Sequence, residues 1–232
     1  MEEKKKVEPI LQTRELCRFY TVGDTQVKAV NQISIPIYPG QLTVLRGRSG
    51  SGKTTLINLL STLDTPTSGT ILYGDQDITQ FSEEQKNQFR RKDIGIIFQA
   101  VALMSQMTAM ENVEFGLRMA GVPYGEHREL AQRYLNLVGL GKRMKHLPGE
   151  LSGGEQQRIA IARALAHSPR IIFADEPTAE LDTATALHMV KLFKDLIEEQ
   201  QMTVVMTTHD PNMMEVADTV YSLRDGEVVD DY

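Results

Sequence analysis

Short, uninterrupted apolar runs alternate with longer amphipathic segments along this chain, an order typical of α/β proteins. The apolar runs are residues 42–45, 94–98, 171–174 and 203–206. They predict strands of a mostly parallel sheet that is covered on both faces, because a half-exposed strand would alternate apolar with polar residues.

Polar and amphipathic segments between these runs predict helices. One helix begins near Lys53, and a polar helix spans residues 82–91, where Ser82 and Gln85 have the spacing of a capping box. A further helix is expected over residues 183–200.

An amphipathic block at residues 107–147 predicts an inserted group of helices. Gly121-Val122-Pro123 and the stretch 139–141 break this block. Outside it, residues 27–30, 33–37 and 69–73 predict short strands, and Asp225-Gly226 predicts the tight turn of a closing hairpin.

Composition narrows the classes of protein. The 232 residues, 41% of them hydrophobic, suffice for one large domain or a core with an inserted subdomain. With 25 basic and 31 acidic residues the net charge is −6, which does not favour a nucleic-acid partner. A single cysteine, a charged start and apolar runs far shorter than the ~20 residues of a membrane span predict a cytoplasmic protein.

The octapeptide Gly47-Arg48-Ser49-Gly50-Ser51-Gly52-Lys53-Thr54 matches the phosphate-cradling loop in full, between a strand and a helix. The glycines let backbone N–H groups wrap the β-phosphate. Lys53 supplies positive charge to the β- and γ-phosphates, and the Thr54 hydroxyl can ligate Mg²⁺. Ser51 and Thr55 are lesser donors. The loop predicts a nucleotide–magnesium site.

Two acids end the apolar run 171–174. Successive strand side chains point in opposite directions, so Asp175 and Glu176 should do different work. Asp175 would hold hydrated magnesium, and Glu176 would orient or deprotonate the water that attacks the γ-phosphate. The alternative is an exposed strand end that is merely acidic.

A glycine pair follows a helix-capping serine in Leu151-Ser152-Gly153-Gly154-Glu155-Gln156-Gln157-Arg158. Ser152 and Glu155 form a second capping-box spacing, and Gly153 and Gly154 would leave backbone N–H groups open to an anion. Its own spacing also allows a capped surface helix with small residues.

Four polar residues have two readings each. Gln99 follows a predicted strand at the edge where α/β sheets bind ligands, but it could equally be a polar loop residue. His209 follows another strand and could be structural. Asp182 could cap the helix from Thr183, and Tyr20 could be ordinary strand packing.

Taken together, the motifs resemble the ATP-binding subunit of ABC transporters over nearly the whole chain. The resemblance is carried, in the order of that family, by the loop at Gly47, Gln99, residues 151–157, Glu176, residues 179–182 and His209. It implies a P-loop NTPase (RecA-like) core with an antiparallel β subdomain in a single domain, 1–232. Residues 1–98 and 169–232 would form the core, and residues 99–168 the helical subdomain.

The same resemblance implies a magnesium-dependent ATPase, with ATP and Mg²⁺ as its ligands. It assigns Tyr20 to stacking on adenine, Gln99 to magnesium and to coupling with the membrane subunit, Asp182 to communication between two sites, and His209 to the γ-phosphate. The implied catalytic residues are Lys53, Gln99, Glu176 and His209, and the implied magnesium ligands are Thr54, Gln99 and Asp175.

The implied partners are a second copy and a separately encoded membrane permease, with a periplasmic or extracellular adaptor as a further candidate and no nucleic acid. Ser152 and Gly154 of one copy would touch the ATP held by the other in a head-to-tail dimer. The subunit would lie on the cytoplasmic face of the cell membrane. Alternatives are a soluble ABC ATPase of DNA repair, translation or cofactor assembly, and a regulator of cell division.

Two segments, 62–69 and 108–113, most resemble the branch that contains the lipoprotein-release ATPase LolD, the macrolide-export ATPase MacB and the division ATPase FtsE. We therefore expect an export or lever-type system. Ala179-Glu180 departs from the glycine-asparagine pair common there, and residues 102–105 lack the usual proline where the membrane subunit would dock.

Overall fold

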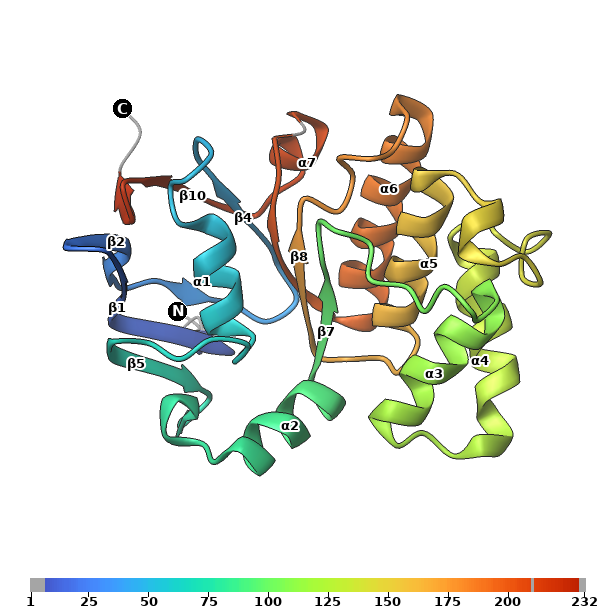
Figure 1. Ribbon diagram of the computed structural model, residues 1–232, viewed down its shortest axis with the longest axis horizontal. Helices are drawn as coiled ribbons and strands as arrows, with labels where there is room; N and C mark the ends of the chain where they lie inside the picture. Colours follow the sequence, from blue (N-terminus) through green and yellow to red (C-terminus); the bar gives the residue numbers. More distant parts are fainter. Residues whose placement is uncertain (1–6, 210, 230–232) are drawn as a thin grey trace, which may run out of the picture.

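A computed structural model describes residues 7–209 and 211–229, so the charged start of the chain lies outside the described residues. The fold has a mixed six-stranded sheet in the middle, an antiparallel sheet on one side and a group of helices on the other (Figure 1). This is the α/β architecture with an antiparallel β part and inserted helices that the sequence predicts.

The central sheet has the order β11-β10-β4-β9-β8-β7. Every neighbouring pair is parallel except the final hairpin of β10 and β11. Its strands are β4 (Leu42–Arg46), β7 (Ile94–Ile97), β8 (Ile171–Asp175), β9 (Thr203–Thr207), β10 (Thr219–Arg224) and β11 (Glu227–Val229).

Both faces of this sheet are buried, as the unbroken apolar runs predict. Ile171 and Phe173 of β8 pack into one core with α1 (Lys53–Leu60), whereas Ile172 and Ala174 pack into another with α5 (Gly153–Leu165) and α6 (Thr183–Gln200). Alternate side chains of one strand thus serve opposite cores.

The inserted helices are α3 (Ala109–Ala120) and α4 (Tyr124–Leu137), followed by α5. Gly121 ends α3 at φ 81°, a conformation that favours glycine. Buried residues of α3 and α4 share a continuous core with α5 and the sheet, so the helical block is packed directly onto the strands.

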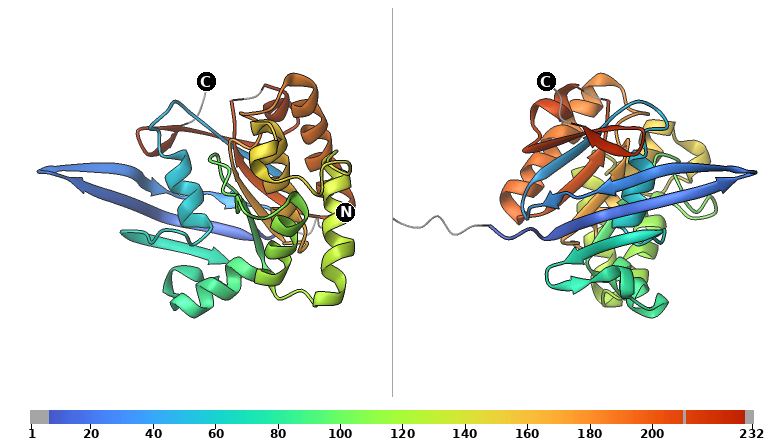
Figure 2. Two further views of the ribbon diagram at one scale, coloured as in Figure 1. Left: turned by 45° about the vertical axis from the view of Figure 1, so that its right-hand side comes forward. Right: turned by 90° about the vertical axis from the view of Figure 1, so that its left-hand side faces the viewer.

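A long antiparallel ribbon projects from the body and is formed by β1 (Leu11–Val22) and β2 (Thr25–Ile33) (Figure 2). The predicted strand at 33–37 is wrong at Ser34 and Ile35, because the chain leaves β2 there before the short β3 (Pro36–Ile37). Glu15, at φ 47°, bulges β1 opposite this break and donates its N–H to Ser34 Oγ at 2.8 Å. Cys17 of β1 is buried.

The remaining elements connect the layers. As predicted, Ser82 caps the polar helix α2 (Glu83–Lys92) with Gln85 in a complete capping box. Within the described residues, no helix combines the length and apolar character that crossing a bilayer requires. The other elements are β5 (Ser68–Tyr73), β6 (Gln76–Asp77), α2 (Glu83–Lys92), α7 (Pro211–Glu215) and the short 3₁₀ turns Ile78–Gln80 and Pro148–Glu150.

Candidate functional site

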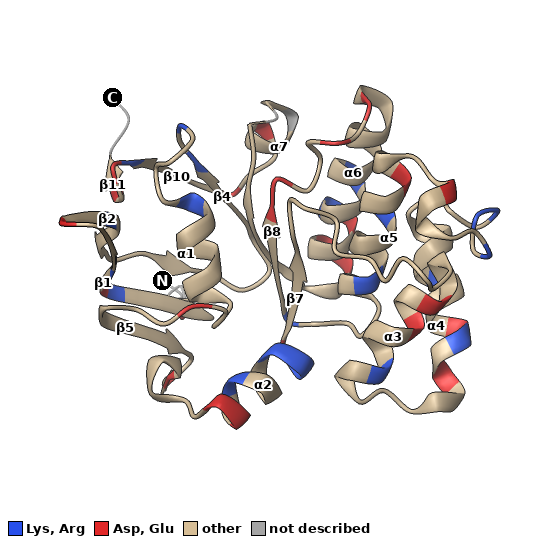
Figure 3. Cartoon of the chain, in the orientation of Figure 1, with Lys and Arg blue, Asp and Glu red and all other residues tan. Residues whose placement is uncertain are grey.

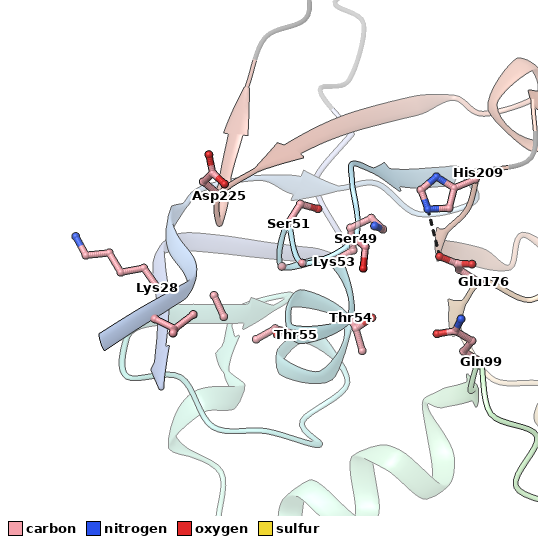
Figure 4. Close-up of a pocket in the computed structure, with 14 residues that line it drawn as sticks. Lys28, Ser49, Ser51, Lys53, Thr54, Thr55, Gln99, Glu176, His209 and Asp225 are labelled. Atoms are coloured by element: carbon pink, nitrogen blue, oxygen red, sulfur yellow. Dashed lines mark ion pairs between the residues drawn. The ribbon is translucent and has the colours of Figure 1, made fainter. Parts of the chain in front are cut away.

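A cavity of about 520 Å³ lies at the carboxyl ends of the parallel strands, where open α/β sheets bind ligands (Figure 4). The basic start of α1 and the acidic end of β8 lie at this same edge (Figure 3). Its lining residues are Val27, Lys28, Ala29, Ser49, Gly50, Ser51, Gly52, Lys53, Thr54, Thr55, Gln99, Glu176, His209 and Asp225.

The phosphate loop joins β4 to α1 in a conformation that depends on glycine. Gly52 has φ 101°, and a Cβ there would collide with the carbonyl oxygen of Ala29 on β2. Lys53 is buried, and its ammonium donates to the carbonyls of Gly47 at 2.7 Å and Arg48 at 3.1 Å. An ammonium has three donors, so within the described part of the chain one remains for a phosphate oxygen.

A chain of hydrogen bonds fixes the carboxylate of Asp175. The Thr54 hydroxyl donates to Asp175 Oδ2 at 2.8 Å, and the Thr207 hydroxyl donates to Oδ1 at 2.6 Å. The register of β8 and β9 places Asp175 directly opposite Thr207. Asp175 is thereby held beside the first turn of α1, as the sequence predicts for a magnesium ligand.

Glu176 turns away from Asp175 and into the cavity. Its backbone is left-handed at φ 47°, and its N–H donates to the Thr207 hydroxyl at 2.9 Å. His209 Nε2 lies 3.3 Å from Glu176 Oε1, an ion pair when the imidazole is protonated. The two acids therefore face different surroundings, as predicted, but the cause is the left-handed backbone of Glu176 just after β8 rather than strand alternation.

Gln99 reaches the same cavity from the segment after β7. Figure 4 shows its side chain beside Glu176 and below His209. The predicted residues Lys53, Thr54, Gln99, Glu176 and His209 are thus brought to one place from four segments of the chain.

The glycine pair at the start of α5 does not line this cavity. Ser152 Oγ accepts from the Glu155 N–H at 3.3 Å, and Glu155 accepts from the Ser152 N–H at 3.0 Å, a complete capping box. The hydrogen bond from the Ser152 backbone N–H is the main cause that holds the pKa of Glu155 below its usual range. The Ser152 hydroxyl and Arg143 lower this pKa further, while burial opposes the shift.

Gly154 has a packing role that its sequence does not reveal. A Cβ at this position would lie 3.1 Å from the carbonyl oxygen of Glu180 and 3.3 Å from a methyl group of Leu181. The start of α5 and the segment after β8 are therefore in close backbone contact.

Asp182 and Tyr20 also lie outside the cavity lining. Asp182 caps α6 by accepting from the Thr185 N–H at 3.1 Å, and the Thr185 hydroxyl lowers the pKa of its carboxyl. Tyr20 donates its hydroxyl to Asp64 at 2.7 Å while Arg18 covers its ring. The predicted helix cap is observed at Asp182, whereas Tyr20 is exposed on β1 rather than packed in it, and the nucleotide roles of both residues stay predictions.

Sequence reasoning missed Thr207 and the cavity residues Lys28 and Asp225. The sequence could have indicated Thr207, since this residue ends an apolar strand next to the one that carries Asp175. The others lie on β2 and in the β10–β11 turn, whose approach to the phosphate loop is a matter of tertiary structure.

A family model described as ABC transporter matches residues 30–179, which include the phosphate loop, Gln99, the start of α5 and the acids that end β8. The chain belongs to the ABC transporter family. As an ABC cassette it binds ATP and hydrolyses it with Mg²⁺, and the branch-level resemblance to MacB is confirmed by relatives.

Relatives match the ABC cassette over almost its whole length. An uncharacterized ABC transporter ATP-binding protein of Methanocaldococcus jannaschii is 40% identical over 95% of this chain and 98% of that protein. The macrolide export ATP-binding/permease protein MacB of Syntrophobacter fumaroxidans is 39% identical over 94% of the chain, which spans 31% of that MacB.

Solved ABC cassettes have the same fold. The dimeric cassette MJ0796 superposes with a TM-score of 0.91 at 36% identity, over 95% of this chain and 97% of its own. A dimeric post-hydrolysis state of MJ0796 bound to ADP and Pi also has a TM-score of 0.91, at 35% identity over 96% and 97% of the two chains.

The oxygen donors of the ABC site fit magnesium. The Thr54 hydroxyl, the Asp175 carboxylate and the Gln99 amide are ligands of the hard type that Mg²⁺ prefers, and the first two already touch. Across residues 7–209 and 211–229, no group of three or more His, Cys, Asp or Glu could hold a metal by itself. This suits an ion that is bound together with substrate phosphates.

Proposed function

We propose that this chain is the ATP-driven subunit of a membrane transporter of the export or lever type, in which two copies close head to tail on ATP and move a separate permease. The cavity that gathers the phosphate loop, Gln99, Glu176 and His209 carries the proposal. The MacB relatives, named as ATP-binding/permease proteins, favour an export-type permease as the partner.

Each residue has a role in the proposed reaction. Lys53 holds the β- and γ-phosphates with its remaining N–H donor, and residues 47–52, with Thr55, cradle them through backbone and hydroxyl donors. The Glu176 carboxylate accepts a proton from the attacking water, while His209, whose Nε2 lies 3.3 Å from Glu176 Oε1, donates to the γ-phosphate. Tyr20 would stack on the adenine.

Thr54, Asp175 and Gln99 would hold Mg²⁺, which neutralises charge on the β- and γ-phosphate oxygens when bound. The Thr207 hydroxyl would keep Asp175 oriented toward the ion, and the Thr54 hydroxyl, which donates to Asp175 here, would be a further ligand. Gln99 would reach the ion from the segment after β7, whereas Asp175 ends β8 itself.

The start of α5 would complete the site of the other copy. Each chain has one phosphate loop and one helix start at Ser152, so a closed two-fold dimer has two equivalent sites. Ser152, Gly153, Gly154 and Glu155 would present the helix N-terminus to the partner's γ-phosphate, and Asp182 would link the two sites. Dimeric MJ0796 cassettes support this pairing.

We further propose the organisation 1–98 with 169–232 as the core and 99–168 as the helical subdomain. The permease would place the chain on the cytoplasmic face of the cell membrane, and a periplasmic or extracellular adaptor would extend the system.

Glu176→Gln tests the proposal. The variant should bind Mg²⁺-ATP as the wild type does, form an ATP-dependent dimer and lose hydrolysis by about 10²-fold or more, because the water has no base. Glu198→Gln is the control, since it neutralises an exposed acid on α6 that pairs with Lys194 at 3.9 Å and does not line the nucleotide cavity. Near-normal hydrolysis by Glu176→Gln would contradict the role of Glu176.

Purification of the native complex tests the partner. A membrane permease should accompany the chain in detergent extracts. Isolation with a soluble partner and no membrane protein would refute the transporter assignment.

A further inference from the structure

Gln157 is a buried polar residue that the roles proposed above leave unused. It lies on the first turns of α5, five positions after Ser152, and is 1% exposed. Polar side chains in such places are normally hydrogen-bonded in full. In Gln157 only the amide nitrogen has a hydrogen-bond partner among the described residues.

The amide nitrogen of Gln157 contacts the segment that carries Gln99. Nε2 donates to the carbonyl oxygen of Phe98 at 3.5 Å, a long hydrogen bond directly before Gln99 in the chain. The oxygen Oε1 is buried, and no described group donates to it. A glutamine that served stability alone would be better replaced by an apolar side chain of the same shape, since a buried acceptor without a donor is destabilising.

The same segment is held to the helices at two more points. Arg163, two turns further along α5, donates to the carbonyl of Ala102 at 2.7 Å. Asn112 of α3 accepts from the Met104 N–H at 2.8 Å and donates to the Met107 carbonyl at 2.9 Å. These contacts are short, so the long Gln157 contact is the loosest of the three.

Helix α5 and strand β7 are in close backbone contact near Gln157. A Cβ on Gly95 of β7 would collide with the backbone carbonyl of Ala164 on α5. α5 therefore cannot approach β7 further at Gly95, and beyond the end of β7 it is Gln157 that contacts the residue before Gln99.

We propose that Gln157 is a positioning residue for Gln99. Its carboxamide ties the start of α5, which carries Ser152 and Gly154, to the Phe98 carbonyl, so that Gln99 enters the nucleotide cavity only when α5 is in place. This inference rests on the roles proposed for Gln99 and Ser152. The unpaired Oε1 marks a second hydrogen bond that becomes available when the Phe98–Gln99 segment shifts.

Gln157→Met tests the inference, because methionine keeps the length of the side chain and removes both polar atoms. We expect a kcat for ATP about fivefold to tenfold lower, the loss of roughly one hydrogen bond in the reacting state. The Kd for ATP measured without Mg²⁺ should stay unchanged because the phosphate loop is untouched. The melting temperature should stay equal or rise, because an unpaired acceptor has gone.

Thr43→Val is the matched control. Thr43 Oγ1 on β4 is also buried, has no partner among the described residues and belongs to a residue that is 1% exposed, but β9 and β8 separate β4 from β7, which leads to Gln99. Its variant should show the same or a higher melting temperature with wild-type kcat.

Two results would overturn the inference. One is a wild-type kcat in Gln157→Met, and the other is a fall in kcat matched by a fall in melting temperature, as a purely structural residue would give. Measuring Glu176→Gln in the same series separates the two claims. Activity in that variant would refute the proposed function, whereas its loss beside a normal Gln157→Met refutes only the role of Gln157.

Discussion

At the scale of single residues, the phosphate loop is shaped by what its glycines exclude. Gly50 and Gly52 both have positive φ, 79° and 101°, but only Gly52 faces another backbone, at Ala29. Gly50 has open space around its Cβ position. A side chain at Gly50 would therefore suffer only backbone strain, whereas one at Gly52 would suffer backbone strain and a steric clash.

We predict that Gly50→Ala lowers the free energy of unfolding by about 1 kcal/mol, the usual cost of a left-handed alanine. Gly52→Ala should cost several times as much, because the collision with β2 forces the loop to move, and should abolish ATP binding. Urea titration and a fluorescent ATP analogue measure the two effects. Equal stability losses in the two variants would contradict the steric argument.

Thr207 connects the two acids of the site, since its hydroxyl donates to Asp175 and accepts from the Glu176 N–H. Thr207→Val keeps the volume and leaves a buried carboxylate short of one donor. We expect a loss of about 1–3 kcal/mol in unfolding free energy and a kcat at least tenfold lower. Thr207→Ser should restore most of both, and a failure of serine to do so would argue against the hydroxyl as the cause.

The position of a residue could be predicted from the sequence where the residues around it in space are also its neighbours in the chain. Strand, loop and helix are contiguous around Lys53, so the cradle was predictable. The contacts of Tyr20 were not, because Asp64 and Arg18 approach it through the folding of β1 against the segment before β5. There the Tyr20 hydroxyl, the Thr65 N–H and Arg18 outweigh burial and lower the pKa of Asp64.

At the scale of elements, helices were easier to predict than the antiparallel strands. Capping boxes at Ser82 and Ser152 and the αL stop at Gly121 are local signals, and the structure bears them out. The strand β1 was missed, because charged residues interrupt its apolar positions and its register shifts against both β2 and β5 between Arg14 and Phe19. Its pairing with β2, β3 and β5 is what defines it.

The junction of α5 and β7 should make stability depend on pH. His167 follows α5, and its Nε2 lies 3.1 Å from the carbonyl of Ile94 on β7. Burial lowers the pKa of His167 below the ordinary 6.5, because its effect is larger than that of the hydrogen bond to Ile94, which raises this pKa. The folded chain therefore keeps the imidazole neutral at a pH where the unfolded chain takes up a proton.

The contribution of neutral His167 to the free energy of unfolding is thus fully present above about pH 6.5. It is lost as the pH falls from there toward the lower pKa that His167 has in the folded chain, by at most about 1.4 kcal/mol for each pH unit. Melting temperatures between pH 7.5 and 5 should fall less steeply in His167→Gln than in the wild type. Parallel curves would show that His167 does not contribute.

At the scale of the whole molecule, the proposed dimer would bring the start of α5 of one copy to the cavity of the other. The start of α5 carries its glycines away from the chain's own cavity. Ser152→Arg should therefore leave the affinity of one copy for ATP unchanged but block ATP-dependent dimerisation and lower turnover by about 10²-fold.

Light scattering of Glu176→Gln and of Glu176→Gln with Ser152→Arg, each with Mg²⁺-ATP, tests this. Only the first should dimerise. Equal dimerisation of both would contradict the composite site. EDTA should also return the first to monomers, because ATP without magnesium cannot engage Thr54 and Asp175.

The placement of Cys17 has a practical consequence for following that closure. The chain has one thiol, and it lies buried in β1, where the Gln32 N–H donates to its sulfur at 3.2 Å. Reagents that alkylate surface thiols should pass it by. A cysteine introduced at an exposed position such as Leu187 of α6 would then carry the only spin label or dye in each copy, and the spacing between two labels would report each round of opening and closing without removal of a native residue.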